Sequence, residues 1–444
     1  MKRAALHNLG CKVNAYETEA MQQRLKDNGY AIVPFSEEAD VYIINTCTVT
    51  NIADRKSRQM LHRAKKMNPQ AIVVAAGCYV QASKDACEAD EAIDIVIGNN
   101  KKQDIIEILK EFEEKRKPKD TVIDISHTKE YEDMPVTRME NHTRAYIKVQ
   151  DGCNQFCTYC IIPFARGRVR SRRAESVREE VTALAKAGFK EIVLTGIHLS
   201  SYGADIPEEE INTLLKLIEC LHVIPGIERI RLGSLEPRIV TRDFVETICA
   251  LPKVCPHFHL SLQSGSDSVL KRMNRRYTSE EYEEGCRLLR EYYTNPAITT
   301  DIIVGFPGET EEEFRETFAF AQKIDFFEMH VFKYSRREGT KAAAMENQVA
   351  ENVKAERSDR LLALERKLSE RYREGFIGKE TDILIEETAE IGGIPYQVGH
   401  TREYIRVAVA GEENLSGKIV TVQLEGFLCD DGNTLLGMIK RQKD

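Results

Sequence analysis

Residues 151–172 read DGCNQFCTYCIIPFARGRVRSR, and the interpretation of the whole chain depends on their three cysteines, Cys153, Cys157 and Cys160. Thiolates at this spacing can bind one face of a cubane iron–sulfur cluster, and three ligands leave its fourth iron open. An open iron can bind a small molecule and pass it an electron. A zinc ribbon would need two CxxC pairs or histidine ligands, and no such partner lies near. We therefore predict a reactive iron–sulfur cluster here, in preference to a zinc site or structural cysteines.

Length and composition limit the class of protein. A chain of 444 residues is long enough for two or three domains, and 42% hydrophobic with 30% charged residues is typical of soluble globular proteins. No apolar run approaches the ~20 residues that span a bilayer, and the first ten residues lack a signal-peptide core. We therefore expect a cytoplasmic protein without membrane contact, whose 12 cysteines are thiols or metal ligands. The net charge of −8 argues against a uniformly basic surface but allows local basic patches.

The first hundred residues alternate between apolar and polar segments. Buried parallel strands are predicted at 4–9, 41–45, 72–76 and 93–97, with helices at 16–28 and 53–67. This pattern predicts a small doubly wound α/β domain of the flavodoxin-like type.

Cys11, Cys47 and Cys78 each follow one of these strands. Loops after parallel strands meet at the carboxyl edge of the sheet, where such folds bind ligands. We therefore predict a second cluster with three protein ligands, although any one of these cysteines could be a small buried hydrophobe. Cys87 is a rival to Cys78, but it lies in a polar, helix-like stretch.

Residues 101–140 are rich in charge and predict a helix and a connector laid across the surface. After them, the strand–helix alternation resumes with longer periods. Strands are predicted at 145–149, 191–195, 228–232, 257–262, 299–304 and 328–332. Six such units are too few for a closed eight-stranded barrel, so we expect an open partial (β/α)6 barrel, with its chemistry at the carboxyl ends of the strands.

Small and polar residues recur at these strand ends. They are Gly196, Ser234, Glu236, Gln263 and, after the strand that carries Asp301, Gly305 with Pro307 and Gly308. One at a time, such glycines are ordinary turn residues. Their recurrence beside a cluster loop favours a cofactor pocket.

Basic residues gather in three groups. They follow the cluster loop (Arg166, Arg168, Arg170, Arg172, Arg173), the fourth barrel strand (Lys271, Arg272, Arg275, Arg276) and Cys47 (Arg55, Lys56, Arg58, Arg63, Lys65, Lys66). Charge runs are often solvated surface. Two of these groups flank cysteine loops, where they could hold a polyanion.

The C-terminal part changes pattern again. A long amphipathic helix at 348–374 precedes short strands at 381–386, 396–399, 404–408, 418–425 and 434–438, which predict a small closed barrel of the oligonucleotide-binding sort. His400, Arg402, Tyr404 and Arg406 alternate basic and aromatic groups and suit contacts with RNA. The alternative is a protein-interaction or lid module.

The CxxxCxxC spacing, with Tyr159 before its last cysteine, resembles the signature of radical S-adenosylmethionine enzymes. With the N-terminal cysteines and the C-terminal barrel in this order, the whole chain resembles the radical S-adenosylmethionine methylthiotransferases. The resemblance implies an N-terminal domain with the auxiliary cluster at 1–115, a linker at 116–142, a radical S-adenosylmethionine core at 143–372 and an RNA-binding TRAM domain at 373–444. It also implies two [4Fe–4S] clusters, held by Cys153, Cys157 and Cys160 and by Cys11, Cys47 and Cys78.

In this family a first S-adenosylmethionine methylates a sulfur carried on the auxiliary cluster. A second S-adenosylmethionine yields the radical that removes hydrogen from the substrate carbon. The methylthio group is then attached to that carbon. Contacts with S-adenosylmethionine are expected at Tyr159, Gly196, Ser234, Glu236, Gln263 and Gly305. The implied partners are the anticodon stem-loop of tRNA and an electron donor such as flavodoxin or ferredoxin.

Three motifs indicate the branch within this family. NLGCKVNAYETEAM (8–21), NTCTVTNIADRKSRQ (45–59) and TGIHLSSYG (195–203) are similar to the branch that modifies N6-threonylcarbamoyladenosine beside the anticodon. The isopentenyladenosine branch reads closer to YGCQMN and NTCSVR, and the branch acting on a ribosomal-protein aspartate closer to NTCGFI. Two other functions stay open: an RNA methyltransferase that uses only the barrel cluster, and a non-catalytic iron–sulfur RNA-binding protein.

Overall fold

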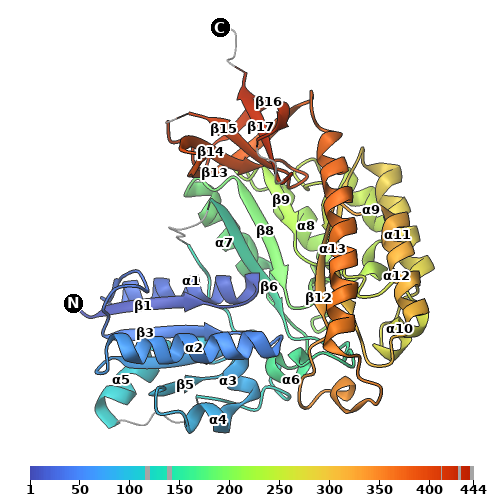
Figure 1. Ribbon diagram of the computed structural model, residues 1–444. Coiled ribbons are helices and arrows are strands. Elements are labelled where there is room, and N and C mark those ends of the chain that lie inside the picture. Colours follow the sequence, from blue (N-terminus) through green and yellow to red (C-terminus); the bar gives the residue numbers. More distant parts are fainter. Residues whose placement is uncertain (116–120, 138–142, 412, 429–431, 441–444) are drawn as a thin grey trace.

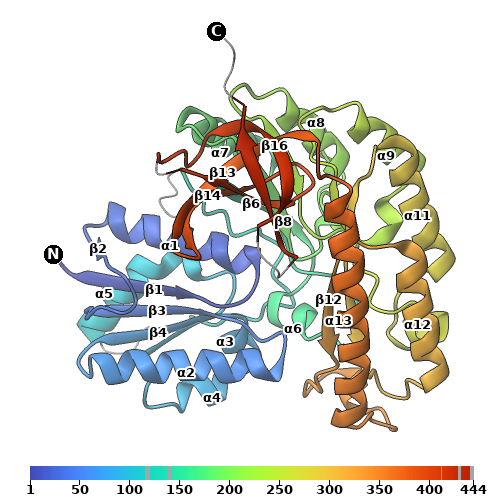
Figure 2. The same cartoon turned by 45° about the horizontal axis from the view of Figure 1, so that its top comes forward.

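The computed structural model describes residues 1–115, 121–137, 143–411, 413–428 and 432–440. The chain forms an N-terminal α/β domain, a central α/β part and a C-terminal β-barrel (Figures 1 and 2). This confirms the predicted fold class and its order. Parts of the predicted linker (116–120, 138–142) and the last four residues of the predicted TRAM domain lie outside the described residues. Within the described ranges, no helix is long and apolar enough to cross a membrane.

The N-terminal domain is a five-stranded parallel sheet in the order β2-β1-β3-β4-β5, with Ala4 opposite Val41 across β1 and β3. Its strands are β1 (Arg3–Asn8), β2 (Ala31–Ile32), β3 (Val41–Thr46), β4 (Ile72–Gly77) and β5 (Ile95–Ile97). Helices α1 (Lys12–Asp27) and α5 (Ile105–Lys115) cover one face, and α2 (Asn51–Met67), α3 (Cys78–Ala82) and α4 (Lys84–Glu88) cover the other. The central strands are apolar along their length because both faces are buried.

The prediction of a surface connector over 101–140 is wrong for two segments. The apolar residues of α5 recur at helical spacing, and Ile105, Leu109 and Phe112 are buried against the N-terminal sheet. Further along, Met134 and Val136 are buried in the core of the central part. The high charge of this region hides short apolar faces that complete both cores.

The central part contains the six predicted strands, β6 (Arg144–Asp151), β8 (Glu191–Gly196), β9 (Arg229–Leu232), β10 (His257–His259), β11 (Ala297–Val304) and β12 (Glu328–Lys333). Parallel pairing joins β6, β8 and β9, and likewise β10, β11 and β12. A parallel bridge between Leu235 and Leu260 connects the two groups. Among the described residues, β6 and β12 do not pair with each other, and a two-residue strand, β7 (Arg170–Ser171), pairs with β6 instead. The expected open barrel is confirmed.

Helices cover the outside of this curved sheet. They are α7 (Ala174–Lys186), α8 (Leu214–His222), α9 (Arg242–Cys249), α10 (Asp267–Arg272), α11 (Ser279–Tyr292), α12 (Glu311–Ile324) and α13 (Glu351–Glu374). The short α6 (Ile162–Arg166) follows the cluster loop and contacts α3 instead. The long α13 packs along β12 (Figure 1). On the other side, α1 of the N-terminal domain packs against β6 and β8. Its Tyr16 and Ala20 belong to the core of the central part, while Met21 and Leu25 belong to that of the N-terminal domain. One helix thus joins two cores.

The C-terminal barrel closes in the order β13-β14-β15-β17-β16. Its strands are β13 (Glu380–Ile391), β14 (Ile394–His400), β15 (Arg406–Ala410), β16 (Ile419–Phe427) and β17 (Thr434–Ile439). The predicted strand at 404–408 begins only at Arg406, because Tyr404 adopts a left-handed conformation (φ 74°) in a turn.

Two of the residues predicted to contact RNA, Arg402 and Tyr404, contact other parts of the protein. Arg402 donates to the carbonyls of Pro252 and Val254, the latter at 2.9 Å. The ring of Tyr404 lies next to those of His257 and His400, at centroid distances of 5.0 and 4.5 Å. Arg402 and Tyr404 therefore help to attach the barrel to the central part, and the contact of this strand with RNA stays a prediction.

Candidate active site

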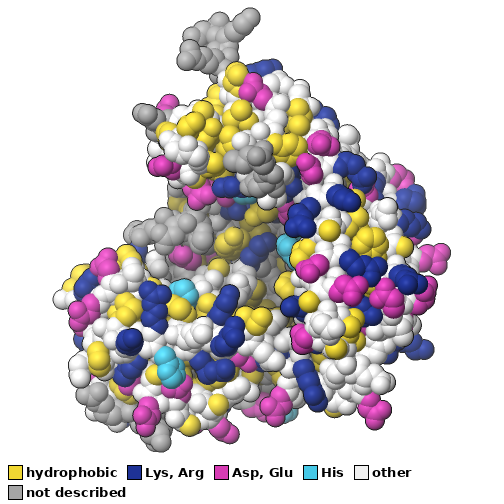
Figure 3. All heavy atoms as spheres, viewed as in Figure 1, with side chains coloured by type: hydrophobic (Ala, Val, Ile, Leu, Met, Phe, Trp, Pro, Cys, Tyr) yellow, Lys and Arg dark blue, Asp and Glu magenta, His cyan; other side chains and the backbone are white. Residues whose placement is uncertain are grey.

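A single cleft opens between the three parts of the molecule, and Figure 3 shows the surface hollowed there. Its volume is about 700 Å³. The lining includes the loop after β1, the loop after β6 and the carboxyl ends of β8 to β12. Cys11, Cys153, Cys157 and Cys160 all line this cleft. The two predicted cluster loops therefore face one common space.

The loop that carries Cys153, Cys157 and Cys160 has a fixed backbone. Gly152 has φ +70°, and a Cβ there would lie 1.8 Å from the carbonyl oxygen of Arg168, so no other residue fits. The amide of Cys153 donates to the carbonyl of Gly167 at 3.0 Å, and that of Thr158 donates to the carbonyl of Met273 at 3.0 Å. The cysteines are therefore positioned by contacts to two other segments.

Nitrogen donors are directed at the sulfur atoms of this loop. The amide of Gln155 lies 3.4 Å from Cys153 Sγ, and Arg275 Nη1 lies 3.4 Å from Cys157 Sγ. Burial, with the neighbouring thiols, raises the pKa of Cys153 to about 11 and that of Cys160 to about 12. Donors of this kind stabilise thiolates, as in iron–sulfur proteins.

Cys11, Cys47 and Cys78 come together at the carboxyl edge of the N-terminal sheet. Cys11 precedes the first residue of α1, Cys47 follows β3 and Cys78 follows β4. Cys11 is exposed at the cleft, whereas Cys47 and Cys78 are buried, and burial raises the pKa of Cys47 to about 12. Two donors reach Cys78 Sγ, namely Arg166 Nε at 3.2 Å and Asn99 Nδ2 at 3.5 Å. The rival Cys87 is buried in the core between α2, α4 and the sheet.

Arg166 belongs to a buried charge cluster between the two domains. Its guanidinium contacts both oxygens of Glu17, at 2.6 and 3.0 Å, and Asp151 Oδ2 at 3.1 Å. Lys148 and Lys102 also contact the Glu17 carboxylate. Arg170 and Arg172 are buried as well, so that of the five basic residues after the cluster loop only Arg168 and Arg173 are exposed. The six basic residues after Cys47 are different, because Arg55, Lys56, Arg58, Arg63 and Lys66 on α2 are exposed.

The residues expected to contact S-adenosylmethionine divide into two groups. Tyr159, Gly196, Ser234, Glu236 and Gln263 line the cleft, whereas Gly305 is not among its lining residues. At Gly305, with φ +71°, a Cβ would lie 2.3 Å from Lys354 Cγ of α13. At Gly196 the space for a Cβ is already taken by the side chain of Gln150. Both glycines therefore permit close packing within the protein.

Sequence reasoning assigned no role to several polar groups of the cleft. His198 Nε2 is buried in the cleft wall without a partner among the described residues. Burial, with Arg275 nearby, lowers the pKa of His198 to about 4 and keeps the ring neutral. Lys12, next to Cys11, also lines the cleft. Their only sequence signal is their proximity to a strand end or a cysteine.

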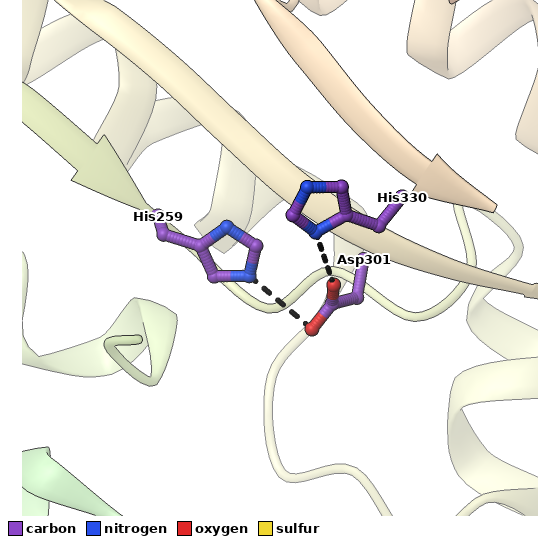
Figure 4. A group of neighbouring side chains, drawn as sticks. All are labelled: His259, Asp301 and His330. Atoms are coloured by element: carbon purple, nitrogen blue, oxygen red, sulfur yellow. Dashed lines mark hydrogen bonds and ion pairs between the residues drawn. The ribbon is translucent and has the colours of Figure 1, made fainter. Parts of the chain in front are cut away.

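Deeper in the cleft, His259 of β10, Asp301 of β11 and His330 of β12 form a compact cluster (Figure 4). Each imidazole contacts one oxygen of Asp301, at 3.2 Å in both cases. The ligand atoms of the three residues lie within 4.8 Å of one another, which would also suit a metal ion. The hydrogen bonds already satisfy both oxygens of the carboxylate, so the cluster is stable as a purely protein arrangement.

The pair His330–Asp301 should make stability depend on pH. The hydrogen bond that His330 donates to Asp301 raises the pKa of His330 above its usual 6.5. The pair therefore stabilises the fold at low pH, and this contribution is lost as the pH rises through the raised pKa. We expect His330→Gln to lower stability by ~0.5–1 kcal/mol at pH 6, a small value because the side chain is half exposed. Calorimetric melting of both proteins from pH 6 to 9 should show the difference shrinking; a constant difference would contradict this role.

Comparisons with known proteins agree with this geometry. Residues 147–321 match the family model of the Radical SAM superfamily, and residues 3–98 match that of Uncharacterized protein family UPF0004. The chain is 44% identical over 425 residues to threonylcarbamoyladenosine tRNA methylthiotransferase MtaB of Bacillus subtilis, covering 96% of this chain and 94% of that protein. It is 41% identical to the MtaB of Aquifex aeolicus, covering 95% and 99%.

Other similar proteins widen this comparison. The chain is 38% identical to the tRNA-2-methylthio-N(6)-dimethylallyladenosine synthase of Pelotomaculum thermopropionicum, covering 96% of each. Among solved structures, the radical S-adenosylmethionine methyltransferase TsrM of Kitasatospora setae superposes with a TM-score of 0.58 at 17% identity, covering 77% of each chain, a likeness of fold alone. By its sequence identity along nearly its whole length, the chain belongs to the radical S-adenosylmethionine methylthiotransferase family.

Proposed function

We propose that this protein is a tRNA methylthiotransferase that converts N6-threonylcarbamoyladenosine beside the anticodon into its 2-methylthio derivative. The observation that carries the proposal is that Cys11 of the N-terminal set lines the same cleft as Cys153, Cys157 and Cys160. A sulfur source and a radical source must both reach one adenine C2 atom, and a shared cleft meets this requirement. The 44% identity to a protein named for this substrate supports the choice of nucleoside.

Two iron–sulfur clusters fit the residues present. Cys153, Cys157 and Cys160 would hold the [4Fe–4S] cluster that binds S-adenosylmethionine, and Cys11, Cys47 and Cys78 would hold the auxiliary cluster. The donors directed at Cys153, Cys157 and Cys78 suit thiolate ligands. When bound, the clusters supply the electron that cleaves S-adenosylmethionine to the 5′-deoxyadenosyl radical, and the sulfur that is transferred.

The protein's own residues position these groups and shield them from water. The proposal assigns Tyr159, Ser234, Glu236 and Gln263 to S-adenosylmethionine, since all four line the cleft. Two S-adenosylmethionine molecules are used per turnover. One provides the methyl group, and the other is cleaved to methionine and a radical that removes the C2 hydrogen as 5′-deoxyadenosine. The C–H bond is unactivated, so placement matters more than acid–base chemistry.

The proposal also assigns surfaces to the macromolecular partners. The exposed basic face of α2 lies next to the Cys47 loop and could bind the phosphates of the anticodon stem-loop. The C-terminal barrel would add contacts to the RNA. An electron donor such as flavodoxin or ferredoxin would reduce the cluster, and the reaction would take place in the cytoplasm, where tRNA is.

A defined RNA substrate tests the proposal. Reconstituted protein, S-adenosylmethionine and a reductant are incubated with an anticodon stem-loop that carries N6-threonylcarbamoyladenosine, and the nucleosides are analysed by mass spectrometry. We expect a product that has gained one methylthio group in place of one hydrogen. Parallel reactions with the isopentenyladenosine RNA and a ribosomal-protein peptide test the two alternative substrates. Turnover of one of these, without turnover of the first RNA, would refute the proposal.

A further inference from the structure

Lys12 is a cation without a partner in the cleft. It follows Cys11 directly and begins α1, and its side chain lines the cleft with the barrel cysteines. Its ammonium makes no hydrogen bond or ion pair with any described residue. Most long cationic side chains near a domain junction in this molecule are paired, as Lys102 and Lys148 are with Glu17. Lys12 is exposed to the space of the cleft, so its ammonium is available to an anionic ligand that enters there.

The acidic groups around Lys12 are already used by other cations. Asp301 is hydrogen-bonded to two histidines, and Glu191 contacts Arg231 Nε at 2.7 Å. On the same wall, Arg144 contacts Glu386 at 3.0 Å. The charged groups whose fields reach Lys12 are, in order, Arg144, Arg231, Asp301 and Glu191. This part of the cleft is therefore electropositive and suits one further negative charge.

We propose that Lys12 binds the carboxylate of the threonylcarbamoyl group of the substrate nucleoside and so selects it over nucleosides whose N6 substituent is apolar. This inference rests on the proposed function. The threonine moiety carries a carboxylate at neutral pH, whereas a dimethylallyl group carries no charge and would leave Lys12 unpaired. Lys12 is also adjacent to Cys11, so a substituent bound there holds the adenine close to the thiols of the N-terminal domain. The cleft, at about 700 Å³, has room for a nucleoside.

Two other anions could compete for this position. They are the carboxylate of S-adenosylmethionine and a phosphate of the RNA backbone. Three stem-loops separate the possibilities: one with N6-threonylcarbamoyladenosine, one with its methyl ester, which removes only the charge, and one with unmodified adenosine. Phosphates are identical in all three. The proteins compared are the wild type, Lys12→Gln, Lys12→Arg and the control Lys186→Gln, which changes an exposed lysine at the end of α7.

We expect the wild type and Lys186→Gln to favour the acid over the ester by roughly 10- to 100-fold in affinity and in kcat/KM, as for a charge-assisted hydrogen bond. Lys12→Gln should treat acid and ester alike, and Lys12→Arg should recover part of the preference. The affinity ratio is measured by equilibrium binding as well as by turnover, so that it can be read even if the variant binds its auxiliary cluster poorly.

Several results would overturn the inference. An acid-over-ester preference that survives in Lys12→Gln shows that another group binds the carboxylate. An equal loss of affinity for all three RNAs assigns Lys12 to a phosphate, and a rise in the KM for S-adenosylmethionine alone assigns it to the cofactor. If the wild type modifies none of the threonylcarbamoyl RNA, the proposed function itself fails. That outcome is distinct, because it is seen before any variant is made.

Discussion

Replacing Cys157 with alanine should abolish both 5′-deoxyadenosine formation and methylthio transfer, whereas replacing Cys47 should abolish transfer alone. The reason is that the two cysteine sets belong to separate domains and are fixed by separate contacts. Cys157 is held by Arg275 and by the loop after β6, and Cys47 lies after β3 of the N-terminal sheet. Loss of one set should therefore leave the other able to bind its cluster.

The measurement is paired chromatography of 5′-deoxyadenosine and of modified nucleoside from the same reaction, with iron content determined for each variant. We expect both products to fall to the level of protein-free controls in Cys157→Ala, and the modified nucleoside alone to do so in Cys47→Ala. Cys87→Ala is the matched control, because Cys87 is buried in the core of the same domain and should not bind a cluster. Methylthio transfer that survives Cys47→Ala would favour the RNA methyltransferase that uses only the barrel cluster. If Cys87→Ala loses methylthio transfer and Cys78→Ala keeps it, the third ligand of the auxiliary cluster is Cys87 and not Cys78.

The second large effect should come from Glu17→Gln. Glu17 is fully buried and contacts Arg166, Lys148 and Lys102. Its removal leaves Arg166 and Lys148 with Asp151, and leaves Lys102 without another ion pair among the described residues. Burial alone would raise the pKa of Glu17, but the charges of Arg166, Lys102 and Lys148 hold it well below its usual value. Breaking a buried network of this kind costs about 3–5 kcal/mol of folding free energy.

Thermal or denaturant unfolding of the apoprotein measures this cost. The control is Glu113→Gln, which breaks a solvent-exposed contact with Lys2 and should change stability by less than ~0.5 kcal/mol. We also expect faster hydrogen exchange along α1 and β6 in Glu17→Gln, since the cluster joins these elements. Equal stability of the two variants would show that the cations relax into solvent, and would refute the structural role of the network.

The sequence predicts the architecture well where a pattern is local. Apolar runs and helical spacing locate the strands of the N-terminal sheet and of the central part. They also predict the five C-terminal strands, but not the order in which these strands pair. The two-residue strands β2 and β7 are too short to leave a pattern. Of the candidate site, the cysteines are predicted and most of the charged groups are not. The six cysteines are recognisable from spacing and from their positions after strands, and the structure gathers each set of three at one place.

The sequence does not show which residue forms an ion pair or hydrogen bond with a given charged side chain. Arg166, Arg170 and Arg172 suggest an RNA-binding run because the sequence does not show their acidic partners, which are Glu17, Asp151 and Glu180. The contacts of Arg402 and Tyr404 with the central part are likewise invisible in the sequence. His259, Asp301 and His330 come from three strands and become a cluster only when the sheet is formed.

Helix α1 fixes the number of residues between Cys11 and Glu17. Cys11 stands at its first turn, Glu17 meets Arg166 less than two turns later, and Tyr16 donates to the carbonyl of Met134 at 2.9 Å. One inserted residue would rotate everything beyond it by about 100° around the helix axis. Such an insertion would turn Glu17 and Tyr16 away from the central part while Cys11 stayed in place. The spacing from Cys11 to Glu17 therefore fixes how the two cysteine sets are placed relative to each other. We expect an insertion within this spacing to be tolerated far less than one after α1 ends at Asp27.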